Sequence, residues 1–118
     1  MEERLLQQLK RGVLEMLVLG LVSEAPTYGY ELLSKLKERS GGLFVLKEGT
    51  LYPILYRLED DGLIEASWSA GEGRTAPKKI YTVTADGREG LKTQQRIWRG
   101  FSAAVERFLE GENEDEHE

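Results

Sequence analysis

Apolar residues recur at helical spacing near the start of the chain and predict a first helix over residues 3–23. The centre of its apolar stripe consists of Leu6, Leu9, Val13, Leu17 and Leu21. Further apolar residues widen the stripe to more than half of the circumference, so the helix must be covered on two sides. The rest of the domain is one cover, and a second copy of the chain is a natural candidate for the other. A second helix is expected over residues 28–40, with Thr27 as its N-cap.

A third helix is predicted over residues 49–61. Its inner stripe consists of Leu51, Leu55 and Leu58. Gly62 can close the helix, because glycine adopts the left-handed conformation that a helix end often requires. Pro53 lacks a backbone N–H and fits best in a first turn, so we expect the helix either to begin near Thr50 or to bend locally.

The pattern then changes to the alternation that is typical of strands. Residues 63–69 and 78–83 predict a hairpin with a long turn over 70–76, and such a hairpin must lean on the helices to be stable. Thr84 can cap a last helix that runs to about residue 109. Along it, residues at alternating spacings of three and four form a heptad seam with one polar position: Leu91, Gln94, Trp98, Phe101, Val105 and Phe108.

The order of these elements predicts a mainly α fold with a small β-hairpin. It is the layout of a winged helix-turn-helix with an added C-terminal helix, in which the third helix would enter the major groove of DNA. We expect a winged helix-turn-helix domain over residues 1–84, a C-terminal dimerisation helix over 85–109 and a disordered acidic tail over 110–118.

Net charge is informative only when it is divided by segment. The chain has 118 residues, with 16 Lys and Arg against 21 Asp and Glu, a formal charge of −5. Six of the acidic residues lie in the last nine positions, which leaves 15 acidic against 16 basic residues in the rest of the chain. A like-charged run of this kind predicts disorder. It is either a solubilising end or an electrostatic brake on DNA or partner binding.

Composition excludes most enzymes. The chain has no Cys, and its one His is residue 117 in the acidic tail. A disulfide framework, a thiolate or His-based metal site and a Ser-His-Asp triad are therefore not expected. We predict no catalytic residues, no cofactor and no metal. The apolar run over residues 13–22 is too short to span a bilayer, and the N-terminus does not resemble a secretion signal, so we expect a cytoplasmic protein without a membrane partner.

The exposed side of the third helix and the hairpin carry groups that contact phosphates and base edges in protein–DNA complexes. The candidate DNA-binding residues are Tyr28, Lys47, Thr50, Tyr52, Tyr56, Arg57, Arg74, Lys78 and Lys79. A solvated helix face and a solubilising turn are the alternatives. Two tyrosines on an exposed helix face are unusual for a plain surface, which favours binding.

Three motifs in order resemble the PadR family of transcriptional regulators. EGTLYPILYRLEDDGLI (residues 48–64) is close to the recognition-helix signature of that family, and YGYEL (28–32) is similar to its second-helix motif. Arg74 and KKIYTVTADG (78–87) resemble its wing and the start of its last helix. The resemblance is close over about residues 10–90, and the layout of 91–109 is similar to the branch with a single C-terminal helix.

The resemblance implies a homodimeric repressor that binds a palindromic operator. Thr50, Tyr52 and Arg57 would then lie at the DNA interface, while Tyr28, Lys78 and Lys79 would contact its backbone. The first and last helices would form the dimer interface, for which we expect Leu6, Leu9, Val13, Leu91, Ile97, Trp98, Phe101, Val105 and Phe108. The near-neutral body predicts that specific binding depends visibly on salt.

Trp98 has two interpretations. At its seam position it is expected to pack in the core or the dimer interface. A flat aromatic residue near a two-fold axis can also stack on a ligand, and multidrug-sensing members of the branch look similar here. A planar hydrophobic molecule is therefore a candidate partner that would release the DNA. The alternative to a repressor is a ligand- or protein-interaction module that keeps the winged-helix fold without operator recognition.

Overall fold

Two consecutive helices occupy the place of the single first helix that the sequence predicts. In this computed structural model, which describes residues 2–71, 73 and 75–116, they are α1 (Glu2–Arg11) and α2 (Leu14–Glu24). The prediction of one helix over 3–23 is wrong at Gly12 and Val13. Gly12 disfavours a helix interior, and the chain turns there with the Val13 N–H donating to the Lys10 carbonyl at 3.1 Å.

The next two helices lie close to their predicted positions. They are α3 (Gly29–Arg39) and α4 (Glu48–Asp60). Thr27 is not the side-chain cap of α3: Tyr28 holds the N-cap position, and the Thr27 hydroxyl donates to Glu31 Oε1 at 2.8 Å. Gly62 ends α4 as expected, with a φ of 74°, and the Leu63 N–H reaches back to the Leu58 carbonyl at 2.9 Å.

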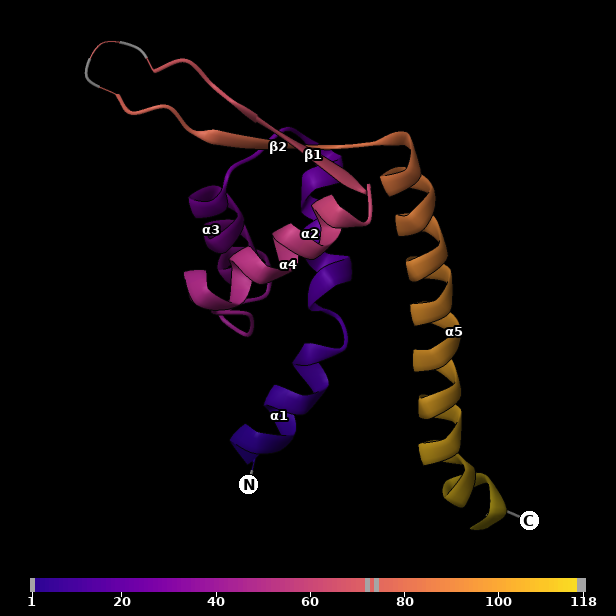
Figure 1. Ribbon diagram of the computed structural model, residues 1–118. Coiled ribbons are helices and arrows are strands. Elements are labelled where there is room, and N and C mark those ends of the chain that lie inside the picture. The colour runs from indigo at the N-terminus through magenta and orange to yellow at the C-terminus, as the bar shows by residue number, and fades with distance from the viewer. Residues whose placement is uncertain (1, 72, 74, 117–118) are drawn as a thin grey trace.

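The predicted hairpin is confirmed. Strands β1 (Ile64–Trp68) and β2 (Lys79–Val83) pair in antiparallel fashion, from Ile64 opposite Val83 to Trp68 opposite Lys79. The hairpin extends from the helices as a long arm (Figure 1). A two-residue bridge between Thr27 and Tyr81 joins the turn before α3 to β2, with the Tyr81 N–H donating to the Thr27 carbonyl at 2.7 Å.

The last helix, α5 (Ala85–Glu116), begins where predicted and ends later. The Gly87 N–H donates to the Thr84 hydroxyl at 3.0 Å, so Thr84 caps the helix. The expected end near residue 109 is wrong, because the helix continues to Glu116 through a segment without proline. The predicted disorder of the acidic tail over 110–118 stays a prediction, and residues 117–118 lie outside the described part of the chain.

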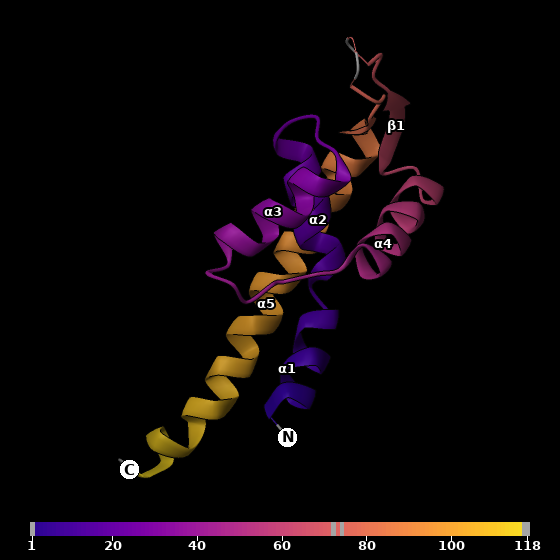
Figure 2. The ribbon, with the colours of Figure 1, turned by 90° about the vertical axis from the view of Figure 1, so that its left-hand side faces the viewer.

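The core gathers around α2, which contacts α3, α4, α5 and β2. Val18, Leu32, Leu55 and Tyr81 are fully buried, and one residue of α5, Leu91, joins them. The helices α1 and α5 leave this core and run toward the same end of the molecule, where both termini lie (Figures 1 and 2).

Candidate nucleic-acid interface

Helix α4 has one buried and one exposed face. The side chains that it turns inward are Leu51, Ile54, Leu55 and Leu58, at helical spacing. Thr50, Tyr56 and Arg57 lie on its exposed surface, and Lys47 is exposed at the N-cap position. The buried leucines therefore fix the orientation of the hydroxyl, phenol and guanidinium groups that the sequence predicts to be DNA-binding.

Tyr52 connects α4 to the beginning of α3. A Cβ atom added to Gly29 would lie 2.6 Å from the Tyr52 hydroxyl, so this phenol packs directly over the glycine. The Tyr52 and Tyr56 rings lie 6.3 Å apart between centroids. Gly29 thus allows the close approach that brings Tyr52 of α4 beside the N-terminus of α3.

Two lysines at the base of the hairpin contact residues at the beginning of α3 and on α4. The Lys78 ammonium lies 4.3 Å from the centroid of the Tyr28 ring, a cation–π contact. The Lys79 ammonium lies 3.3 Å from Glu59 Oε1 and 5.4 Å from the centroid of the Tyr56 ring. The two lysines thereby join the base of the hairpin to Tyr28 before α3 and to Tyr56 and Glu59 on α4.

Lys79 differs from Lys78 in its surroundings. Burial disfavours its charged form, but the Glu59 carboxylate and the Tyr81 hydroxyl beside it together favour that form more strongly, so the pKa of Lys79 lies above its usual value. The side chain is only 29% exposed. Lys79 is therefore a cation held by the protein, whereas Lys78 is exposed to solvent.

Arg57 has a protein partner that the sequence interpretation missed. Its Nε donates to Glu15 Oε1 at 2.6 Å, and both side chains remain about half exposed. Glu15 lies in the first turn of α2, 42 positions earlier in the chain. The only available signal was that Glu15 is the one charged residue in the apolar run over 13–22. Arg74 lies outside the described residues.

The arrangement offers hydrogen-bond donors and two aromatic edges on one surface. Arginine, lysine, threonine and tyrosine side chains supply most contacts to phosphates and base edges in protein–DNA complexes. Thr50, Tyr56 and Arg57 are all exposed on α4, the helix that the sequence predicts to enter the major groove.

Most of the candidate dimer residues are exposed to solvent in the single chain. The exposed members are Leu6, Leu9, Ile97, Trp98, Phe101, Val105 and Phe108. Leu91 is different, because it is only 9% exposed and packs in the core of the chain itself. The first turns of α5 are anchored to α2 at this point, so Leu91 is not on the exposed seam. Val13 is half-buried at the break between α1 and α2.

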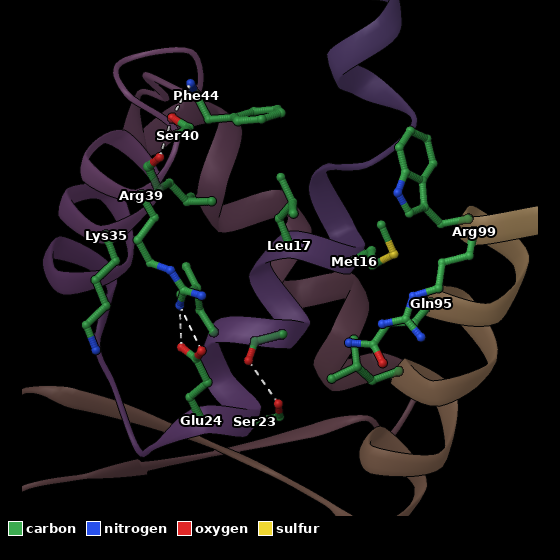
Figure 3. A pocket seen from close by; sticks show the side chains of 15 residues that line it. Met16, Leu17, Ser23, Glu24, Lys35, Arg39, Ser40, Phe44, Gln95 and Arg99 are labelled. Atoms are coloured by element: carbon green, nitrogen blue, oxygen red, sulfur yellow. Dashed lines mark hydrogen bonds and ion pairs between the residues drawn. The ribbon is translucent and has the colours of Figure 1, made fainter. Parts of the chain in front are cut away.

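Trp98 also borders a cavity of about 670 Å³ between α2, α3 and α5. Figure 3 shows Met16 and Leu17 on α2, Lys35 and Arg39 on α3, and Gln95 on α5 around this space. The Arg39 guanidinium donates to both oxygens of Glu24 at its edge. The cavity thus combines apolar walls with a charged rim.

Within the part of the chain that the structure describes, no helix has the length and apolar character needed to cross a membrane.

Residues 18–93 match the family described as Transcriptional regulator PadR-like. The chain is 34% identical over 79 residues to the Negative transcriptional regulator PadR of Bacillus subtilis, covering 67% of this chain and 43% of that protein. A crystal structure of a PadR family transcriptional regulator from Eggerthella lenta aligns with a TM-score of 0.81 at 33% identity, over 92% of this chain and 91% of that one. A PadR-like transcriptional regulator from Bacillus cereus aligns with a TM-score of 0.74 at 33% identity, over 86% and 96%.

Proposed function

Because the chain belongs to the PadR-like family of transcriptional regulators, we propose that it is a repressor that binds a palindromic operator as a homodimer and is released by a small ligand. Helix α4 reads the major groove, and the hairpin touches the DNA backbone. The B. subtilis relative is named as a negative regulator, which supports repression over activation.

The observation that carries DNA binding is the exposed face of α4. Thr50, Tyr56 and Arg57 share that face, and the exposed Lys78 extends it toward the hairpin. Arg57 and Lys78 supply positive charge for phosphates, and the Thr50 hydroxyl suits either a phosphate or a base edge.

The observation that supports a homodimer is the apolar surface of α5 beyond the core. Ile97, Phe101 and Phe108 are each more than half exposed, and Leu5 and Leu9 on α1 add to the same end of the molecule. A group of large apolar side chains exposed along one helix indicates a protein partner. Apolar residues at heptad spacing pair best with another helix that has the same spacing. The α5 helix of a second copy of the chain is such a partner.

Substitution of Arg57 tests the proposed DNA face. We expect Arg57→Ala to weaken binding to the DNA upstream of the protein's own gene by about 1–3 kcal/mol, the usual cost of a lost arginine contact. Arg39→Ala is a matched control, because Arg39 is also an exposed arginine in a 2.6 Å ion pair with a glutamate. Fluorescence anisotropy of labelled DNA at several salt concentrations measures both.

The same titration separates the repressor from the alternative. Equal affinities of the Arg57→Ala variant and the parent at moderate salt would show that the assigned face is wrong. No binding by the parent at any salt would instead favour an interaction module that keeps the winged-helix fold. The net charge of −5 is the observation behind that alternative.

For the ligand, we propose a planar hydrophobic molecule that stacks on Trp98. The cavity beside this residue has apolar walls and a volume in the range of small-molecule sites. Titration with planar aromatic compounds is expected to quench tryptophan fluorescence, and Trp98→Phe should reduce that change while Trp68→Phe leaves it. A signal that does not change across a broad panel would contradict a site at Trp98.

A further inference from the structure

A second groove lies beside the exposed face of α4, at the break between α1 and α2. It has a volume of about 300 Å³, and its walls come from residues 11–15 on one side and the first three turns of α4 on the other. Arg11, Glu15, Thr50 and Arg57 supply its polar groups. The break at Gly12 therefore brings the last residue of α1 next to the helix that the proposed function assigns to the major groove.

The polar groups of this groove suit an anion. Two arginines and a threonine hydroxyl face one carboxylate, so the groove carries an excess of positive charge. Arg11 is exposed, and the structure gives its guanidinium no ion pair in the described residues. Guanidinium groups bind phosphate oxygens with directional, charge-assisted hydrogen bonds.

Glu15 holds Arg57 while the groove is empty of DNA. The contact runs through Arg57 Nε alone, and the pair is about half exposed on both sides. An exposed ion pair of this kind contributes little free energy, so a phosphate can take its place at small cost. The Glu15 carboxylate would also repel a phosphate that enters the groove.

We propose that this groove binds the phosphodiester backbone next to the major groove that α4 occupies, with Arg11 as a direct phosphate contact. Glu15 acts as an internal competitor, which neutralises Arg57 in the free protein and lowers its affinity for DNA in general. The inference rests on the proposed function. It extends the DNA-binding surface from α4 and the hairpin to the α1–α2 junction.

Arg11→Ala tests the contact. It is expected to weaken binding to specific and unrelated DNA by a similar factor and to reduce the slope of log affinity against log salt by about one, as for the loss of one phosphate contact. Arg4→Ala is the matched control, because Arg4 is an exposed arginine on the same helix that does not line the groove. Sedimentation equilibrium and thermal unfolding check that both variants keep the assembly and stability of the parent.

Glu15→Gln tests the competition. It keeps the size of the side chain and removes its charge, so DNA affinity is expected to rise several-fold at low salt and less at high salt. In the Arg57→Ala background this gain in DNA affinity should be smaller, because Glu15 then has no Arg57 to withhold from the DNA. An equal gain in both backgrounds would overturn the competition.

The two levels of the proposal fail in different ways. If the parent does not bind DNA, the proposed function fails and the groove has no role in it. If the parent binds DNA while Arg11→Ala and Arg4→Ala behave alike and Glu15→Gln changes nothing, only the groove inference is overturned.

Discussion

At the scale of single residues, the contact between Tyr52 and Gly29 connects the two helices of the helix-turn-helix. Gly29 has no unusual backbone conformation, since the glycines with positive φ in the described residues are at positions 41, 42, 62 and 73. Its role is to leave room, because any Cβ there would meet the Tyr52 hydroxyl at 2.6 Å. The position of the tyrosine on α4 therefore depends on the absence of a side chain on α3.

Gly29→Ala is expected to affect DNA binding more than stability. The new methyl group displaces the Tyr52 phenol, which weakens operator binding about ten-fold if one contact is lost. The free energy of unfolding should change by about 1 kcal/mol or less, because alanine favours the helix and offsets part of the strain. Anisotropy titrations and urea unfolding measure the two quantities.

Gly20→Ala provides the comparison for this substitution. Gly20 lies inside α2, and a Cβ atom there would meet nothing within 4 Å. We expect the free energy of unfolding of this variant to rise by about 0.5–1 kcal/mol through helix propensity, and we expect it to bind DNA as the parent does.

A second substitution tests the clash itself. Tyr52→Phe in the Gly29→Ala chain removes the clashing hydroxyl. The double variant is therefore expected to have a higher urea midpoint of unfolding than Gly29→Ala. An equal or lower midpoint would contradict the steric explanation.

At the scale of elements, Thr84 joins the hairpin, α4 and α5. Its hydroxyl accepts from the Gly87 N–H at 3.0 Å and donates to the Gly62 carbonyl at 2.7 Å. Gly87 is required beside it, since a Cβ there would collide with the Leu63 carbonyl oxygen. One side chain thus ties the end of α4 to the beginning of the proposed dimerisation helix.

Thr84→Ala should lower the free energy of unfolding by about 1–2 kcal/mol, the usual cost of losing an N-cap side chain. Thr84→Ser keeps the hydroxyl and is expected to lose much less. Urea unfolding followed by circular dichroism measures the difference. Similar losses in the two variants would show that the methyl group, and not the cap, is the important part of Thr84.

Periodicity in the sequence predicts which elements exist, and it fails where a local break competes with it. The leucines of α4 predict its buried face correctly, and Thr84 predicts the start of α5. The apolar stripe over residues 3–23 continues in phase across Gly12, so it hides the break, although Lys10 and Arg11 at the end of α1 are typical of a helix C-terminus.

The candidate site is predictable to a similar degree. A helical period suffices to place Thr50, Tyr56 and Arg57 on one exposed face. The partners of the charged residues are not predictable in this way, because Glu15 and Arg57 are 42 positions apart and meet only once the core has formed. Neighbouring lysines show the same limit: Lys78 and Lys79 look equivalent in the sequence, yet only Lys79 is held by Glu59.

At the scale of the whole molecule, the chain is too extended to be a complete globule. Its radius of gyration is 17.8 Å and its longest dimension is 71 Å, whereas a compact domain of this length has a radius of about 13 Å. The excess comes from the hairpin arm, from α1 and from the part of α5 beyond Leu91, all of which project from the core (Figures 1 and 2). Their exposed apolar side chains are the basis of the proposed dimer.

Phe101→Glu should therefore convert the proposed dimer to monomers at micromolar concentration, because it places a charge in the centre of the apolar seam. Ala103→Glu is the matched control: it introduces the same charge on the same helix, about 200° farther around its axis, at an exposed position. Sedimentation equilibrium measures both masses. A Phe101→Glu variant with the mass of the parent would contradict pairing through this seam.

The length of α5 makes the molecule a lever. Between Phe108 and Ala85 the helix rises about 35 Å at 1.5 Å per residue. In a dimer paired along the seam, a tilt of about 6° at the far end moves the capped beginning of α5 by about 3.5 Å, close to one base-pair step of DNA. If the protein is the ligand-released dimer proposed above, a ligand that shifted the seam by less than the width of an aromatic ring would put the two α4 helices out of register with their half-sites.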